Sequence, residues 1–325
     1  MLRLYTITLL LLLLQPWASI CWAAPQVVVS IKPIHSLVAN IMVGVASPTL
    51  LVKQGGSPHG YAMRPSEARA LHQADLVIWV GPEMESFLEK ALASGNRRQL
   101  QLAAAMPELL HPARSGGQWQ KQEHNHHHDN DDTQVREFDP HIWLGLAQAK
   151  RIGTSTVAAL SEIDPDNRER YQLNGEALLE RLTQLQAELE QQLAPVAHIP
   201  YIVFHDAYQY FEDSFSLNAV GSVAIDPERR PGLRRILEIR RRIKDLGARC
   251  VFSEPQFEPR LVATVIEGTG ASTATLDPVG ADLPAGPNAY FDLMRRMSKA
   301  LAAGLARGEE AKTIGKEAGN AASVF

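Results

Sequence analysis

Residues 123–132 place four imidazoles and four carboxylates within ten consecutive positions, with no apolar residue among them. Such a stretch has no apolar surface to bury, so it does not contribute to a packed core. Imidazole and carboxylate groups are the ligands that proteins offer to borderline divalent metals such as zinc. The run therefore indicates a metal-binding protein, although it does not show where a metal is held tightly.

Other histidines occur singly, next to segments with the character of strands. His59 lies in a glycine-rich loop after the apolar residues 50–52, and His205 directly follows the apolar residues 201–204. His141 stands where an ordered pattern resumes after the polar stretch. In an open parallel sheet, ligands bind outside the carboxyl ends of the strands. Two carboxylates that follow later strands belong to the same candidate set: Glu254 and Asp277.

The rest of the chain alternates short β-branched runs with helical patterns, which is typical of parallel sheets flanked by helices. Strands are predicted at residues 27–31, 50–52 and 76–80, and again at 201–204, 219–223, 250–252 and 273–276. Between these groups, leucines at 178, 182, 185, 189 and 193 recur at helical spacing. A helix of this length is unusual in a globular protein. A coiled coil is one interpretation, and a helix that joins two lobes is the one favoured here.

The predicted fold class is thus α/β, with two lobes, one long rigid linking helix, and a metal site in the cleft between the lobes. The predicted boundaries are an N-terminal lobe at 24–163, the linking helix at 164–194 and a C-terminal lobe at 195–325. The N-terminal lobe is expected to contain a disordered, His/Asp-rich loop at 111–137, and the tail from Gly308 is expected to be weakly structured. With 45% hydrophobic and 21% charged residues, the composition is that of an ordinary globular protein.

Residues 1–23 predict an export signal that is cleaved near Ala23. A short positive start precedes a leucine-rich run, and small residues stand before Ala24. An uncleaved membrane anchor is the alternative, but the apolar run is short for a bilayer span. We expect a periplasmic protein. The net charge of −4 argues against nucleic acid as a partner.

Short segments along the chain resemble, in order, those of the metal-binding solute receptors of ABC importers, and most closely the zinc subgroup. They are residues 30–33 (SIKP), 57–61 (SPHGY), 64–66 (RPS), 79–83 (WVGPE), 139–144 (DPHIWL), 203–208 (VFHDAY), 253–257 (SEPQF) and 276–278 (LDP). A His-rich loop before the second histidine motif is also a feature of the zinc members. The resemblance implies a monomeric receptor, not an enzyme, that captures Zn²⁺ and delivers it to an ABC permease.

Carried over residue by residue, the resemblance implies that the metal ligands are His59, His141 and His205, with Asp277 at an acidic fourth position. Water is the alternative fourth ligand. Manganese members usually have a carboxylate in place of His205, so the histidine favours zinc, which imidazole suits. Since zinc needs unprotonated imidazoles, we expect affinity to fall as the pH drops through roughly 6.5.

The His/Asp run is then interpreted as an auxiliary, weaker metal site. A flexible segment loses ordering entropy when it binds, so it should hold metal less tightly than a preformed cleft. A solvated spacer with incidental affinity is the alternative. The auxiliary ligands proposed from the sequence are His124, His126, His127, His128 and Asp129.

Three rival functions remain open at this point. A zinc hydrolase also uses three histidines with an open fourth position, although neither a His-Glu-x-x-His nor a Gly-x-Ser-x-Gly motif is present. A manganese receptor of the same family is the second. A metal buffer or adhesin that never meets a transporter is the third.

Overall fold

The computed structural model describes residues 24–53, 57–93, 98–114, 119, 137–224, 232–257 and 259–322, without the side chains of residue 259 and residues 307–322. The predicted signal peptide and the His/Asp run lie outside the described residues. None of the helices within this part of the chain is long and apolar enough to cross a membrane.

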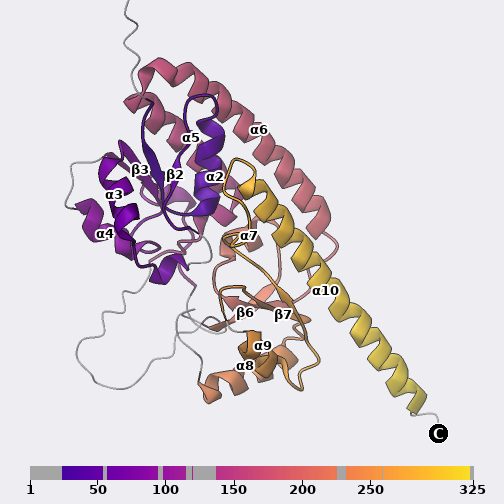
Figure 1. Ribbon diagram of the computed structural model, residues 1–325. Coiled ribbons are helices and arrows are strands. Elements are labelled where there is room, and N and C mark those ends of the chain that lie inside the picture. The colour runs from indigo at the N-terminus through magenta and orange to yellow at the C-terminus, as the bar shows by residue number, and fades with distance from the viewer. Residues whose placement is uncertain are drawn as a thin grey trace, which may run out of the picture.

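Two parallel four-stranded sheets form the framework, as the sequence predicts (Figure 1). The N-terminal sheet has the order β2-β1-β3-β4, from Thr49–Leu50, Val27–Val29, Leu76–Trp79 and Arg98–Gln101. The C-terminal sheet repeats this order as β6-β5-β7-β8, from Ala219–Ala224, Tyr201–His205, Cys250–Ser253 and Ser272–Thr275. In each sheet the winding direction reverses between the two central strands, and such switch points are where α/β proteins bind ligands.

Strand β4 is absent from the sequence-based prediction, because its Arg-Gln-Leu-Gln sequence lacks the apolar character of a buried strand. It is an edge strand, and its first two side chains are exposed. Polar side chains on an exposed edge also discourage pairing with other chains.

Helices cover both sheets. In the N-terminal lobe they are α2 (Lys32–Ile41), α3 (Pro65–Gln73), α4 (Ser86–Ala93) and α5 (Leu146–Ile163). In the C-terminal lobe they are α7 (Gln209–Ser214), α8 (Leu233–Asp245), α9 (Pro259–Ile266) and α10 (Ala289–Ala322). The prediction of a weakly structured tail from Gly308 is wrong in this structure, because α10 continues to Ala322. The tail contains no proline, and its Ala, Glu and Lys residues, which favour a helix, outnumber its three glycines.

The long helix α6 (Arg168–Leu193) follows a short 3-10 turn, η5 (Pro165–Asn167), and runs along the side of the molecule (Figure 1). The stripe of five leucines predicted from the sequence is its buried face, with each residue at most 1% exposed. These leucines belong to one continuous core that includes residues of both sheets. Because both lobes pack on the same core, the helix connects them rigidly.

Helix α5 packs closely against α6, and two glycines make this possible. A Cβ added at Gly175 would lie 2.6 Å from a methyl group of Val157, and one at Gly153 would lie 3.3 Å from Leu178. Helix α5 begins at Leu146 and contacts the short 3-10 segment that follows His141.

A buried carboxyl group after β3 gives the N-terminal lobe a testable pH response. Glu85 is fully buried and accepts hydrogen bonds from the backbone N–H groups of Val80 and Gly81. Burial raises the pKa of Glu85 from 4.5 to about 7. Its stabilising contribution is therefore complete below pH 4.5 and is lost as the pH rises through about 7.

Replacing Glu85 by glutamine should remove this pH dependence while keeping an acceptor for the two N–H groups. Relative to the wild type, Glu85→Gln should gain up to about 3 kcal/mol of unfolding free energy between pH 4.5 and pH 8. Urea unfolding of both metal-free proteins across this range measures the difference. A constant difference would show that Glu85 ionises normally in the folded protein.

Candidate metal centre

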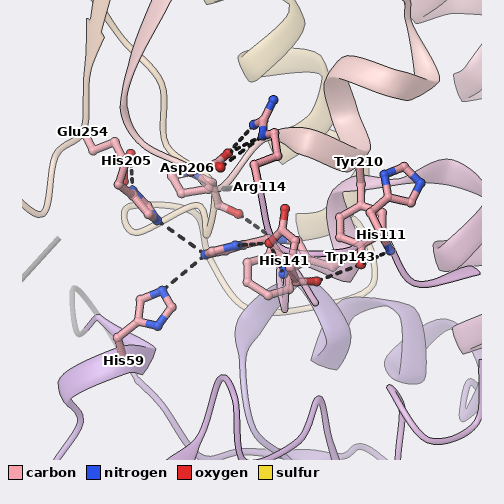
Figure 2. A network of polar contacts seen from close by, with 11 residues as sticks. His59, His111, Arg114, His141, Trp143, His205, Asp206, Tyr210 and Glu254 are labelled. Carbon is pink, nitrogen blue, oxygen red and sulfur yellow. Dashed lines mark hydrogen bonds and ion pairs between the residues drawn. The ribbon is translucent and has the colours of Figure 1, made fainter. Parts of the chain in front are cut away.

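Three histidines from distant parts of the chain meet between the lobes (Figure 2). His59 lies in a short 3-10 helix, η1 (Pro58–Gly60), whose start is capped by Ser57 Oγ accepting the N–H of His59. His141 directly precedes the 3-10 helix η4 (Ile142–Leu144). His205 is the last residue of β5, at the switch point of the C-terminal sheet. The N-terminal lobe thus contributes two of the imidazoles and the C-terminal lobe one.

The spacing of the three imidazoles suits a tetrahedral metal. The Nε2 atom of His141 lies 3.2 Å from Nε2 of His59 and 3.4 Å from Nε2 of His205. Two nitrogens that each bind a tetrahedral zinc at about 2.0–2.1 Å are separated by about 3.3–3.4 Å. These two separations match a shared zinc ion, and all three ligand atoms lie within 4.8 Å of one another.

Two carboxylates fix the orientation of two of the rings. Asp139 Oδ1 lies 2.6 Å from Nδ1 of His141. Glu254 Oε1 lies 2.6 Å from Nδ1 of His205 (Figure 2). Because a carboxylate accepts, each Nδ1 carries the hydrogen and donates it, which leaves the Nε2 lone pair facing the other histidines. Lone pairs held this close repel each other unless a cation lies between them. The arrangement is the carboxylate–histidine pairing typical of metal sites.

Burial strengthens this electrostatic preference. His141, His205 and Glu254 are 2%, 5% and 3% exposed, whereas His59 is only partly buried. The two carboxylates would balance the charge of a bound dication, since the three imidazoles are neutral when they bind. The pocket around them is lined by residues of both lobes, among them Ser57, Trp143, Phe257, Pro278 and Val279.

A salt bridge beside the site also joins the lobes. Arg114 donates from Nε to both oxygens of Asp206 at 3.0 Å and from a terminal nitrogen to Glu212 at 2.6 Å. Burial alone would lower the pKa of Arg114, but Glu212 and Asp206 raise it above its ordinary value. Asp206 directly follows His205, so this charged group helps hold the end of β5.

The remaining predicted site residues have different positions. Asp277 follows β8, and its oxygens accept the N–H groups of Val279, Gly280 and Ala281 and the side-chain amide of Gln256. In the described part of the chain, the group of possible ligand atoms lying within 4.8 Å of one another contains the three histidines and not Asp277. Asp277 as the fourth ligand stays a prediction, and it would require the carboxylate to leave some of these bonds.

The auxiliary ligands, namely His124, His126, His127, His128 and Asp129, lie outside the described residues. The sequence indicated no role for Asp139, and it indicated Glu254 as a candidate site residue without showing its pairing with His205. The signal for Asp139 is its spacing: a carboxylate two residues before His141 can reach both the backbone N–H and the ring, at 3.0 and 2.6 Å. Nothing in the sequence pointed to Arg114.

Comparison with known proteins identifies the family of this chain. The family model described as "Zinc-uptake complex component A periplasmic" matches residues 27–304. The high-affinity zinc uptake system protein ZnuA of Brucella abortus is 40% identical over 300 residues, which cover 85% of this chain and 90% of the relative. The protein of the same name from Yersinia pestis is 36% identical over 285 residues, with the same coverage.

Among solved structures, a zinc-bound ZnuA with residues 138–173 of its own chain deleted superposes with a TM-score of 0.70 at 26% identity. The match covers 87% of this chain and 98% of that structure. The matched residues of the family model extend over both lobes. The chain belongs to the ZnuA family of periplasmic zinc-uptake components.

Proposed function

We propose that the protein is an extracytoplasmic receptor that captures Zn²⁺ in its interlobe cleft and delivers it to an ABC permease. The observation that carries the proposal is the trio of Nε2 atoms 3.2 and 3.4 Å apart at the cleft. The names of the relatives support zinc as the transported ion and the periplasm as the compartment. The proposed ligands are His59, His141 and His205.

The chemistry of the donor set favours zinc over manganese. Three imidazoles provide a nitrogen-rich, compact site, whereas manganese prefers carboxylate and water oxygens in a larger shell. The carboxylates of Asp139 and Glu254 are each engaged with a histidine Nδ1, so they act on the metal through the rings. The fourth position is proposed for water or for Asp277.

The auxiliary site in the His/Asp run is proposed from the sequence alone. Its density of imidazoles suits the collection of zinc, and its lack of apolar residues suits weak, exchangeable binding. The run is not needed for tight binding under this proposal, because the three cleft histidines are placed by ordered elements of the two lobes.

The rival functions make different use of the same site. A hydrolase needs a metal-bound water and a substrate-sized space, and assays of the zinc-loaded protein with ester, peptide and phosphate substrates test it. A buffer or adhesin binds zinc equally well but never passes it on. We propose a monomeric, non-enzymatic receptor, since the family consists of binding components for transport.

Growth in zinc-poor medium separates a receptor from a buffer. In a strain that lacks its own zinc receptor but keeps the permease, this protein should restore growth and uptake of ⁶⁵Zn. The same gene in a strain without the permease should restore neither. Restoration that does not depend on the permease would favour the buffer, and no restoration in the first strain would contradict the proposed function.

A further inference from the structure

A row of polar side chains on α2 joins the two lobes beside the pocket. Lys32, Ser36 and Asn40 are spaced by four residues, so they lie on one face of the helix. Asn40 donates to the carbonyl oxygen of Pro287 at 2.7 Å, and Ser36 Oγ accepts the N–H of Tyr290 at 2.9 Å. Each contact therefore links the N-terminal lobe to residues 278–290 of the C-terminal lobe.

Lys32 makes the most extensive contacts of this row. Lys32 is only 8% exposed. An ammonium group has three N–H donors and no acceptor. All three find a partner, because Nζ lies within 2.5–3.0 Å of three carbonyl oxygens of a single loop, those of Gly280, Ala281 and Leu283.

The same loop is organised from its other side by Asp277. Its carboxylate accepts the N–H groups of Val279, Gly280 and Ala281. The loop thus turns its N–H groups toward an anion and its carbonyl groups toward a cation. Burial lowers the pKa of Lys32, and the negative charges of Asp277 and Asp282 act in the opposite direction.

The loop held by Lys32 also forms one wall of the metal pocket. Pro278 and Val279 line the pocket, and the carbonyl oxygen of Pro278 accepts the indole N–H of Trp143 at 2.7 Å. Trp143 lies two residues after His141, and the two rings are 5.4 Å apart. Movement of this loop away from α2 would therefore disturb both the pocket wall and the neighbour of a proposed ligand.

We propose that Lys32 is a positioning residue for metal retention. Its hydrogen bonds hold residues 278–283 against α2 and so fix the spacing between the histidines of the two lobes. Its bonds oppose separation of the lobes beside the pocket, although Lys32 itself does not touch the metal. The inference rests on the proposed zinc site. Under this proposal, the hydrogen bonds of Lys32, which is not a metal ligand, control the rate of zinc release.

The test replaces Lys32 by methionine, which is similar in length and carries no charge, in the mature full-length protein. Zinc should dissociate about 10-fold faster or more from Lys32→Met when a chelator traps the released ion. Lys32→Arg should fail in the same way, because a planar guanidinium cannot direct its donors onto three converging carbonyls. The matched control is Lys150→Met, which removes a lysine bonded to Gln186 within the helical layer.

Hydrogen exchange of the tryptophan indole N–H groups distinguishes local release of residues 278–283 from a general loss of stability. In Lys32→Met, the indole N–H of Trp143 should exchange at least about 10-fold faster, while that of the buried Trp79 in the N-terminal sheet should not change. Equal acceleration of both indoles would mean a general loss of stability and would overturn the proposal. The proposal would also be overturned if Lys32→Met showed wild-type exchange at Trp143 and wild-type zinc release.

A second variant covers the possibility that Lys32→Met does not fold. Lys32→Gln keeps at most two donors for the three carbonyls, and the same two measurements apply to it with the same expected directions. If the wild-type protein itself retained no zinc, the proposed function would fail. Exchange at Trp143 in the metal-free variants would then still decide whether Lys32 holds the loop.

Discussion

Replacing His205 by alanine is expected to weaken zinc binding by more than about 100-fold. Loss of an outer partner of a metal ligand alone typically costs 10–100-fold in affinity. Removing the imidazole itself takes away one of three nitrogens and the only one from the C-terminal lobe. It also leaves Glu254, which is 3% exposed, as a buried carboxylate without its ring partner.

Competition with a chromophoric zinc chelator at pH 7.5 measures the change. His198→Ala is the matched control, since His198 is an exposed histidine of the same lobe. It should bind zinc like the wild type. If His205→Ala and His198→Ala both bound zinc with wild-type affinity, the ligand set proposed here would be wrong.

Neutralising the two buried carboxylates should have the second largest effect. Glu254→Gln and Asp139→Asn each keep an oxygen that can accept from histidine Nδ1, but each removes a negative charge. A zinc affinity 10–100-fold lower is expected for each variant. The reason is twofold: the neutral amide holds the tautomer less firmly, and the charge of the bound dication loses half of its nearby compensation.

Calorimetric or competition titration of zinc measures both variants. Because the two carboxylates act on the same ion, the double variant should not show the simple sum of the two free-energy losses. Glu267→Gln, an exposed carboxylate of the C-terminal lobe paired with Arg240, provides the control. Affinities that match this control would show that the carboxylates only support the fold.

The sequence contained enough information for the architecture because the determining signals are local. Runs of three to five residues, mostly apolar or β-branched, predicted most of the strands, and the leucine stripe predicted the buried face of α6. The polar edge strand β4 lacked such a signal. Helix α5 was also absent from the prediction, since its middle contains Gly153, Thr154 and Thr156, which weaken a helical pattern.

The candidate site was predictable in part for a different reason. Side chains that follow the strands of one parallel sheet lie at the same edge of that sheet, so His205, Glu254 and Asp277 could be grouped from the sequence alone. The contacts that orient them could not be, because they depend on which strands are adjacent. Glu254 reaches His205 only because β5 and β7 are neighbours in the sheet.

The interlobe contacts were the least predictable feature. Lys32 and the carbonyl of Gly280 are separated by 248 positions, and their bond involves a backbone atom that carries no sequence signature. Because of such contacts, the relative position of the two lobes depends on more than the linking helix. They also give the protein a means of retaining an ion that is independent of the ligands themselves.

Native mass spectrometry with a panel of divalent metals tests the central claim most directly. It should be run on the mature protein, on a variant lacking residues 122–132, and on His205→Ala. The account predicts that the deletion variant retains one tightly bound zinc, that His205→Ala retains none, and that manganese does not displace zinc. Loss of the tight ion in the deletion variant, or a preference for manganese, would contradict it.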